Sequence, residues 1–203
     1  MKKKDLEIAL QRVTPFRSPN PAREQYSTPA VIAADMVFTA YAQGDVDGRT
    51  VMDLGCGTGI LAIGAFMLGA RRVIGVDVDA DALRQAKENA DKAGAIIDFV
   101  ESDIKGFEGE ADTVVMNPPF GSQKKHADRP FVEKAMDIAT VVYSLHMANT
   151  EDFLLRLVRS RGAGADIQKR YKFEIPFTFA FHKKAKKDVE VLLLRIQTNG
   201  ENE

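Results

Sequence analysis

The sequence predicts an α/β fold with a seven-stranded, mostly parallel sheet, one antiparallel edge strand and helices on both faces. Two observations carry this prediction. Short apolar runs alternate with helical segments from residue 51 onward, and strands that alternate with helices have right-handed crossovers and therefore lie parallel. The last two β-rich stretches follow one another without a helix between them, which favours an antiparallel edge.

The elements follow in a regular order along the chain. Strands are expected at residues 51–54, 73–77, 97–100, 113–116, 141–145, 166–173 and 189–197. Helices are expected at residues 60–68, 81–92, 131–139 and 149–160, the second capped by Asp81 and ended by Gly94, the fourth capped by Asn149. Residues 1–45 are expected to form a helical N-terminal extension with a proline-rich loop, and residues 46–203 a single domain.

Composition limits the protein to an ordered, globular class. The chain has 203 residues, 45% hydrophobic and 28% charged, which is too apolar for a disordered chain and long enough for a well-buried core. Its single cysteine, Cys56, excludes a disulfide framework and a cysteine-cluster zinc site, and we predict no metal site. No apolar run approaches the ~20 residues of a membrane span, and no signal segment follows Met1. We therefore expect a soluble cytoplasmic protein.

The net charge of −1 conceals an uneven distribution. Residues 77–112 hold eleven acidic and four basic side chains, a local balance of −7. Residues 153–196 hold eleven basic and four acidic side chains, a local balance of +7. A basic half is typical of a polyanion-binding surface, although a solvated surface with counter-charges nearby would have the same composition.

A glycine-rich loop lies where the first strand passes into the first helix. It reads Asp53-Leu-Gly-Cys-Gly-Thr-Gly59, and in such folds ligands bind at the carboxyl ends of the strands. The loop lacks the G-x-G-x-x-G spacing of dinucleotide sites and the lysine of a phosphate-binding loop. A carboxylate here would repel a pyrophosphate but suits a ligand with an ammonium and a sulfonium group. These features favour S-adenosylmethionine.

Two further carboxylates follow the next strands. Asp77 ends the second strand and can accept hydrogen bonds from both hydroxyls of an adenosine ribose. Asp103 follows the third strand and can accept from an adenine amino group, while Ile104 covers the face of that ring. Either aspartate alone could be a cap, but three cofactor-type positions on consecutive strands favour the same ligand.

The motif Asn117-Pro-Pro-Phe120 follows the fourth strand and indicates the reaction. The exocyclic amine of adenine is a poor nucleophile because its lone pair is delocalised into the ring. The Asn117 carboxamide oxygen and the Pro118 carbonyl can each accept one N–H of that amine, which aims the lone pair at the methyl group. Pro119 stiffens the loop, and Phe120 can stack on a planar substrate. A proline turn without catalytic function is the alternative.

Longer motifs resemble one family. The segments EQYSTP (24–29), NPPFGSQKKHADRPF (117–131), VYSLH (142–146) and FHKKAKKDVEVLLLRI (181–196) resemble the methyltransferase-like-five family. The resemblance runs from about Glu24 to Ile196. It implies a Rossmann-like class I methyltransferase fold, S-adenosylmethionine as cofactor, and methylation of N6 of an adenosine in small-subunit ribosomal RNA.

The resemblance also implies the residues of the site. The N-terminal extension would complete it by closing over the cofactor. The implied catalytic residues are Asn117, Pro118, Pro119 and Phe120. The implied cofactor contacts are Gln25, Tyr26, Thr28, Asp53, Gly55, Cys56, Gly57, Thr58, Gly59, Ile60, Asp77, Asp103, Ile104 and Asn117.

Basic residues beyond these motifs predict the RNA contacts. Lysines could hold phosphates while one base is flipped toward the cofactor. The candidate RNA-binding residues are Lys124, Lys125, His182, Lys183, Lys184, Lys186 and Lys187. The other two histidines, His126 and His146, have no metal-ligand spacing and are expected to be packing or hydrogen-bonding residues. The resemblance further implies a small zinc-binding activator subunit that adds a strand to a sheet edge.

Other functions stay open at this point. A protein glutamine N5-methyltransferase would present the same two amide N–H donors to the same acceptors, although such enzymes usually carry Tyr at the position of Phe120. A ribosomal RNA guanine-N2 enzyme can share the Asn-Pro-Pro-Phe motif. A catalytically idle RNA-binding ribosome-assembly factor could keep the cofactor for stability, but the intact Asp53, Asp77 and Asn117 argue against it.

Overall fold

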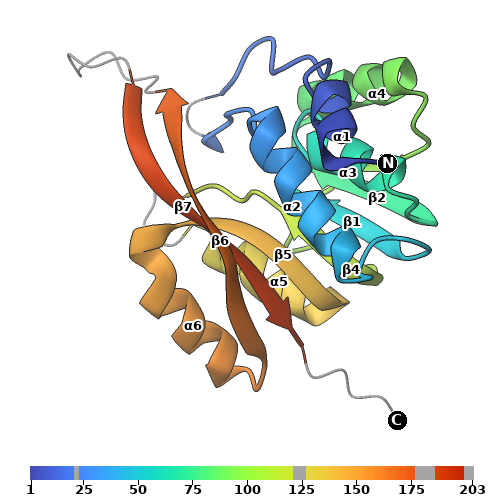
Figure 1. The fold of residues 1–203 in the computed structure, drawn as a ribbon. Coiled ribbons are helices and arrows are strands. Elements are labelled where there is room, and N and C mark those ends of the chain that lie inside the picture. The colour runs from blue at the N-terminus through green and yellow to red at the C-terminus, as the bar shows by residue number, and fades with distance from the viewer. Residues whose placement is uncertain (21–22, 121–126, 177–185, 199–203) are drawn as a thin grey trace.

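The computed structural model describes residues 1–20, 23–120, 127–176 and 186–198 (Figure 1). The strands are β1 (Thr50–Leu54), β2 (Arg72–Asp77), β3 (Asp98–Glu101), β4 (Ala111–Met116), β5 (Ala139–Met147), β6 (Gly164–Pro176) and β7 (Lys186–Gln197). The helices are α1 (Lys3–Leu10), α2 (Ala30–Ala42), α3 (Ile60–Met67), α4 (Ala80–Ala93), α5 (Arg129–Ile138) and α6 (Glu151–Ser160), with a 3-10 turn (Ala148–Thr150) before α6.

All the strands of the described residues belong to one seven-stranded sheet, in the order β3-β2-β1-β4-β5-β7-β6. The first five strands in this order run parallel to one another. Strand β7 runs antiparallel to both β5 and β6. The predicted seven-stranded, mostly parallel sheet is therefore confirmed, and its antiparallel strand lies one place inside the β6 edge.

Both faces of the sheet are covered by helices. Neighbouring residues of each central strand point to opposite faces, and because the residues on both faces are apolar, both faces must be buried. On β4, Val115 packs into a core shared with α1, α2 and α3, whereas Val114 and Met116 pack into a core shared with α5 and α6. Figure 1 shows these two groups of helices on opposite sides of the sheet. Nearly continuous apolar strand sequences are the direct consequence of this double burial.

Two of the predicted helix caps are wrong. Helix α4 is capped by Asp79, whose Oδ1 accepts from the backbone N–H groups of Asp81 and Ala82. Asp81 itself lies inside the first turn, where its charge favours the helix N-terminus. Helix α6 begins after the 3-10 turn with no side-chain cap, so Asn149 does not cap it. Gly94 ends α4 in the left-handed conformation, as expected, with φ 65°.

The N-terminal helices belong to the same apolar core as the sheet. Leu6 and Leu10 of α1 are buried together with residues of α2, α3 and β1. Asp35 of α2 accepts hydrogen bonds from Lys3 of α1 and from Lys169 and Tyr171 of β6, at 2.7–2.8 Å. Residues 1–45 are thus packed against α3 and β1 and hydrogen-bonded to β6. The division of the chain into residues 1–45 and residues 46–203 stays a prediction.

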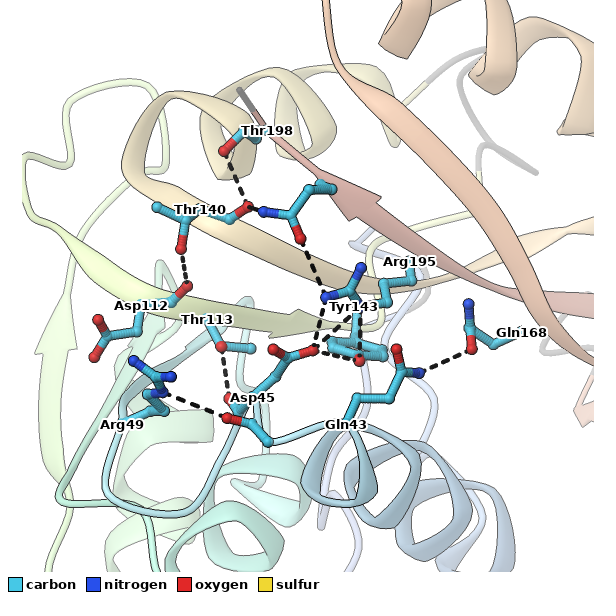
Figure 2. A network of polar contacts seen from close by, with 12 residues as sticks. Gln43, Asp45, Arg49, Asp112, Thr113, Thr140, Tyr143, Gln168, Arg195 and Thr198 are labelled. Atoms are coloured by element: carbon cyan, nitrogen blue, oxygen red, sulfur yellow. Dashed lines mark hydrogen bonds and ion pairs between the residues drawn. The ribbon is translucent and has the colours of Figure 1, made fainter. Parts of the chain in front are cut away.

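A polar network also holds the end of α2 against the sheet (Figure 2). The Asp45 carboxylate accepts from the Tyr143 hydroxyl of β5 at 2.7 Å and from the Arg195 guanidinium of β7 at 3.1 Å. The backbone carbonyl of Asp45 accepts from the Thr113 hydroxyl of β4 at 2.6 Å. One residue therefore connects the N-terminal segment to three strands that are distant from it in sequence.

Candidate active site

The cavity of the predicted site lies where the strand order reverses. Strands β1 and β4 are neighbours, but the chain leaves β1 toward β2 and leaves β4 toward β5, which opens a crevice at their carboxyl ends. A cavity of about 350 Å³ lies there, lined by residues that follow β1, β2, β3 and β4 and by the segment before α2. This volume lies within the range of small-molecule sites.

The glycine loop forms one wall of the cavity. Gly55, Gly57 and Gly59 all have left-handed backbones, with φ of 78°, 51° and 83°. A Cβ atom on Gly57 would lie 2.7 Å from the ring of Phe16, and one on Gly55 would lie 3.0 Å from the ring of Phe131. Only glycine fits between these rings. Phe16 and Phe131 both line the cavity, and no sequence motif indicates either of them as a site residue.

Asp77 presents its carboxylate to the cavity from the end of β2. Its Oδ2 accepts from the Gly57 N–H at 2.8 Å, and its Oδ1 accepts from the Asp79 N–H at 2.9 Å. Each oxygen keeps a second lone pair, so the carboxylate is fixed and can still accept from two ribose hydroxyls. Burial raises the pKa of Asp77. The geometry fits the adenosine end of S-adenosylmethionine.

Asp53 lies beneath the glycine loop and is 1% exposed. Its Oδ2 accepts from the Ala62 N–H at the start of α3, at 3.0 Å. Burial, and to a lesser extent the nearby Asp77, raise the pKa of Asp53 to about 7. Burial without a neighbouring cation disfavours the ionised form of the Asp53 carboxyl. A positively charged group of the ligand would stabilise that ionised form, so this position favours such a group.

We expect the stability of the cofactor-free protein to fall as pH rises from 5 to 8. A carboxyl group with a raised folded-state pKa stabilises the fold below its unfolded pKa of about 4 and loses that contribution as pH rises through the folded value. For Asp53 this window ends near pH 7, and thermal unfolding between pH 5 and 8 measures it. Asp53→Asn should flatten the slope, and an unchanged slope in that variant would contradict the assignment.

Three other predicted contacts border the cavity. Asp103 and Ile104 follow β3 and line it, and Asp103 Oδ1 accepts from the Lys105 N–H at 2.8 Å, which fixes the turn. Cys56 lies in the glycine loop with its side chain buried, and burial raises the pKa of its thiol well above the usual value. A protonated, buried thiol is a poor nucleophile.

Asn117 follows β4 and is held by two hydroxyl groups. Its Nδ2 donates to Thr28 Oγ1 at 2.9 Å, and the Tyr26 hydroxyl donates to its Oδ1 at 3.3 Å. Asn117, Pro118 and Pro119 line the same cavity as the glycine loop. The predicted amine acceptors and the predicted cofactor contacts therefore meet in one place.

Most of the predicted site residues lie together, and some do not. The predicted residues that line the cavity are Gln25, Tyr26, Thr28, Asp53, Gly55, Cys56, Gly57, Thr58, Ile60, Asp77, Asp103, Ile104, Asn117, Pro118 and Pro119. Gly59 packs against α4 and Phe99. Phe120 is 8% exposed and packs against Tyr26, with ring centroids 5.2 Å apart. Neither lines the cavity, and the stacking function of Phe120 stays a prediction.

The predicted RNA-binding residues cannot be placed in the same way. Lys124, Lys125, His182, Lys183 and Lys184 lie outside the described residues. Lys186 and Lys187 are the first residues of β7, described for their backbone alone. These assignments stay predictions.

A buried polar chain supports the wall of the cavity from behind. His146 of β5 contacts Asp128 Oδ2 through Nδ1 at 2.9 Å and Ser144 Oγ through Nε2 at 2.7 Å. All three side chains are almost fully buried. Asp128 lies immediately before α5, whose Pro130 and Phe131 line the cavity. His146 is thus a hydrogen-bonding residue of the interior, as the sequence indicated, and Asp128 is the partner that the sequence did not reveal.

Comparisons with known proteins agree on the class. Residues 33–118 match the family described as "Ribosomal protein L11 methyltransferase (PrmA)". The chain is 36% identical to rRNA N(6)-adenosine-methyltransferase METTL5 of Danio rerio, over 96% of this chain and 98% of the relative. It is 39% identical to an uncharacterised protein of Methanocaldococcus jannaschii, over 98% of this chain and 96% of the relative. A crystal structure from Pyrococcus horikoshii, described as a candidate RNA methyltransferase, has a TM-score of 0.91 at 40% identity and covers 98% of both chains.

The fold and the cavity define a Rossmann-like class I methyltransferase. With the near full-length similarity to METTL5 proteins, the chain belongs to the METTL5 family, and the resemblance read from its motifs is confirmed. Among the described residues, no helix is long and apolar enough to cross a membrane.

Proposed function

We propose that this enzyme transfers the methyl group of S-adenosylmethionine to the exocyclic N6 amine of an adenosine in small-subunit ribosomal RNA. The supporting observation is that Asn117 and Pro118 open on the same cavity as the glycine loop and Asp77. Two amine acceptors and a nucleoside-binding carboxylate beside one small-molecule site suit methyl transfer to an exocyclic nitrogen. The METTL5 relatives carry the name rRNA N6-adenosine-methyltransferase.

The chain's own residues fit the cofactor. When bound, S-adenosylmethionine supplies an activated methyl group on a sulfonium, so the reaction needs no strong base. Asp77 accepts from the ribose hydroxyls with the oxygen lone pairs that its two backbone contacts leave. Asp103 and Ile104 hold the adenine ring, and the glycine loop lets the backbone approach the methionine end.

Asn117 and Pro118 orient the target amine. The Asn117 Oδ1 and the Pro118 carbonyl each accept one N–H, which favours a pyramidal nitrogen whose lone pair points into the cavity. The nitrogen lone pair would form the bond to the methyl carbon as the carbon–sulfur bond breaks, with the bonding pair staying on the sulfur. The nitrogen, positively charged after the transfer, would then lose its proton to water. These two acceptors therefore contribute to catalysis by orienting the amine.

The substrate side of the proposal rests on charge. The basic half of the sequence, with a local balance of +7 over residues 153–196, suits a phosphate backbone. We propose that the RNA backbone contacts the predicted lysines and that residues 1–45 complete the cofactor site. We further propose that the enzyme acts in the cytoplasm.

Replacing Lys183 and Lys184 by glutamate should weaken RNA binding and reduce the steepness of its salt dependence, because each phosphate contact releases counterions. Titration of labelled ribosomal RNA at several salt concentrations measures the slope. The double variant Lys87→Glu/Lys92→Glu on the exposed side of α4 makes the same change in net charge and serves as control. Equal slopes in the two double variants would mean that the predicted lysines are a solvated surface.

We further propose that an activator subunit adds a strand to β3. This short strand ends the sheet on the side away from β6, and an unpaired edge is a template for another strand. Three large apolar side chains near it are exposed: Ile96 at 82%, Val78 at 49% and Val100 at 37%. A zinc-binding partner of the kind that the family resemblance implies would cover them.

The test is methyl transfer from labelled S-adenosylmethionine to purified small ribosomal subunits, their naked RNA and total ribosomal protein, with nucleoside analysis of the product. N6-methyladenosine in the RNA supports the proposal, and the preferred form of RNA reports whether the enzyme acts before or after assembly.

Three other results contradict the proposal. Label in protein would indicate a glutamine methyltransferase. The match to ribosomal protein L11 methyltransferases, which ends at residue 118, is the reason for including total ribosomal protein in the assay. Label on guanosine N2 would indicate the related guanine chemistry. No label, even after the candidate activator is added, would indicate an idle RNA-binding factor.

A further inference from the structure

The Asn117 carboxamide is held on both sides by the segment that precedes α2. Thr28 Oγ1 accepts from Asn117 Nδ2 at 2.9 Å, and the Tyr26 hydroxyl donates to Asn117 Oδ1 at 3.3 Å. Thr28 is 7% exposed, so water competes little for its hydroxyl. Residues 26 and 117 lie in the same site although 91 positions separate them in sequence.

Holding the carboxamide matters because the terminal torsion of asparagine is broad when nothing fixes it. A carbonyl oxygen has two lone pairs. The Tyr26 O–H takes one of them, which leaves the other for an N–H of the target amine and polarises the carbonyl toward it. Burial and the nearby Glu24 raise the pKa of Tyr26 well above its usual value, so the hydroxyl keeps the proton that it donates.

Tyr26 also contacts the other end of the same motif. Its ring lies 5.2 Å from that of Phe120, at 40° between the planes, a tilted packing typical of aromatic pairs. One side chain therefore contacts both the first and the last residue of the Asn-Pro-Pro-Phe motif, and its hydroxyl and its ring can be tested separately.

The segment that carries Tyr26 and Thr28, residues 23–28, is anchored at its other end beside the ribose carboxylate. Gln25 Nε2 and Arg23 Nη1 both contact Asp79 Oδ2, at 2.8 and 2.9 Å, and Asp79 donates its N–H to Asp77. Between these anchors, Glu24 has a left-handed backbone with φ 51°, which no other described non-glycine residue shares. Glu24 keeps this strained backbone because Arg23 and Gln25 on either side of it are both held by Asp79. Strained backbone of this kind is often found at functional sites.

From these contacts we infer that Tyr26 and Thr28 are positioning residues for the methyl-transfer step, which hold Asn117 so that its oxygen meets the target amine. The inference rests on the proposed function, since it assigns these two hydroxyls to catalysis rather than to cofactor binding. Residues 23–28 thereby join the ribose side of the cavity to the amine side.

Tyr26→Phe and Thr28→Val each remove one hydroxyl and keep the shape of the side chain. We expect each variant to lower kcat about tenfold, since loss of one orienting hydrogen bond has about that effect on a rate. The Kd for S-adenosylmethionine, measured by calorimetry, should stay within about twofold, because the hydroxyls act on Asn117. Tyr41→Phe and Thr39→Val on α2, outside the cavity lining, are the matched controls and should keep the wild-type kcat.

A wild-type kcat in both Tyr26→Phe and Thr28→Val would overturn the inference. A loss of cofactor affinity as large as the loss of kcat would also overturn it, because the two residues would then be cofactor contacts.

The side-chain amide resonances of Asn117 in ¹⁵N-labelled protein provide a readout that needs no substrate. They should shift in Thr28→Val and stay in place in Thr39→Val, and unchanged resonances in Thr28→Val would overturn the contact. A methylation assay of the wild-type enzyme separates this inference from the proposed function. Absence of adenosine methylation would contradict the proposed function, whereas the amide resonances would still show whether the hydroxyls hold Asn117.

Discussion

Asn117→Ala should lower methyl transfer to adenosine by about a hundredfold to a thousandfold, while the affinity for S-adenosylmethionine changes only a few-fold. The alanine removes the oxygen that accepts an N–H of the target amine, and preorganised polar contacts of this kind contribute about 10²–10³ to a rate. Single-turnover transfer to ribosomal RNA measures the first quantity, and calorimetric titration of the cofactor measures the second.

Asn117→Asp is the informative companion to this variant. Aspartate keeps an acceptor oxygen at the same position but loses the amide N–H that donates to Thr28. Its rate should lie between those of the wild type and Asn117→Ala. Parallel loss of rate and of cofactor affinity in Asn117→Ala would mean that Asn117 supports the cavity and does not hold the amine.

His146→Ala should lower the free energy of unfolding by about 3–5 kcal/mol. The substitution leaves the buried Asp128 carboxyl without its partner on β5 and opens a cavity in the core, and losses of either kind have costs of this size. Urea denaturation measures the change, with the m-value unchanged if the folded state keeps its compactness.

Two variants give this stability prediction its controls. Ser144→Ala removes the partner of Nε2 alone and should cost about 1–2 kcal/mol. His146→Asn places an amide nitrogen near the position of Nδ1, so it should recover part of the loss by donating to Asp128. A smaller loss in His146→Ala than in Ser144→Ala would show that the Asp128 contact contributes little to stability.

The parts of the fold that the sequence predicts are those with a local signal. The strands are runs such as Val73 to Val76 whose burial on both faces leaves no polar position to obscure them, and Gly94 ends its helix by the left-handed conformation that glycine adopts readily. The cap at Asp79 is not evident from the sequence, because three aspartates occur within five residues. The hydrogen bonds that Asp79 accepts from the N–H groups of Asp81 and Ala82 identify it in the structure.

The site residues, too, differ in whether a local sequence signal or only a tertiary contact reveals them. Asp53, Asp77 and Asn117 are predictable because each lies at or just beyond the carboxyl end of a strand, and the carboxyl ends of parallel strands meet at one edge of the sheet. Phe16 against Gly57, and Tyr26 against Asn117, are contacts between an irregular segment and distant strands. No periodicity or spacing encodes such packing, so only the folded structure reveals it.

The position of β7 has a consequence for how the protein is made. This strand is late in the sequence, yet it lies between β5 and β6 and supplies buried residues to both cores, among them Leu192, Leu193 and Leu194. During synthesis, at about 5–20 residues per second, the edge of β5 and the core residues that pack against β7 stay uncovered until Gln197 has been added. Folding therefore cannot proceed strand by strand behind the ribosome, and a nascent chain that stalls before β7 presents an open, apolar sheet edge to other chains.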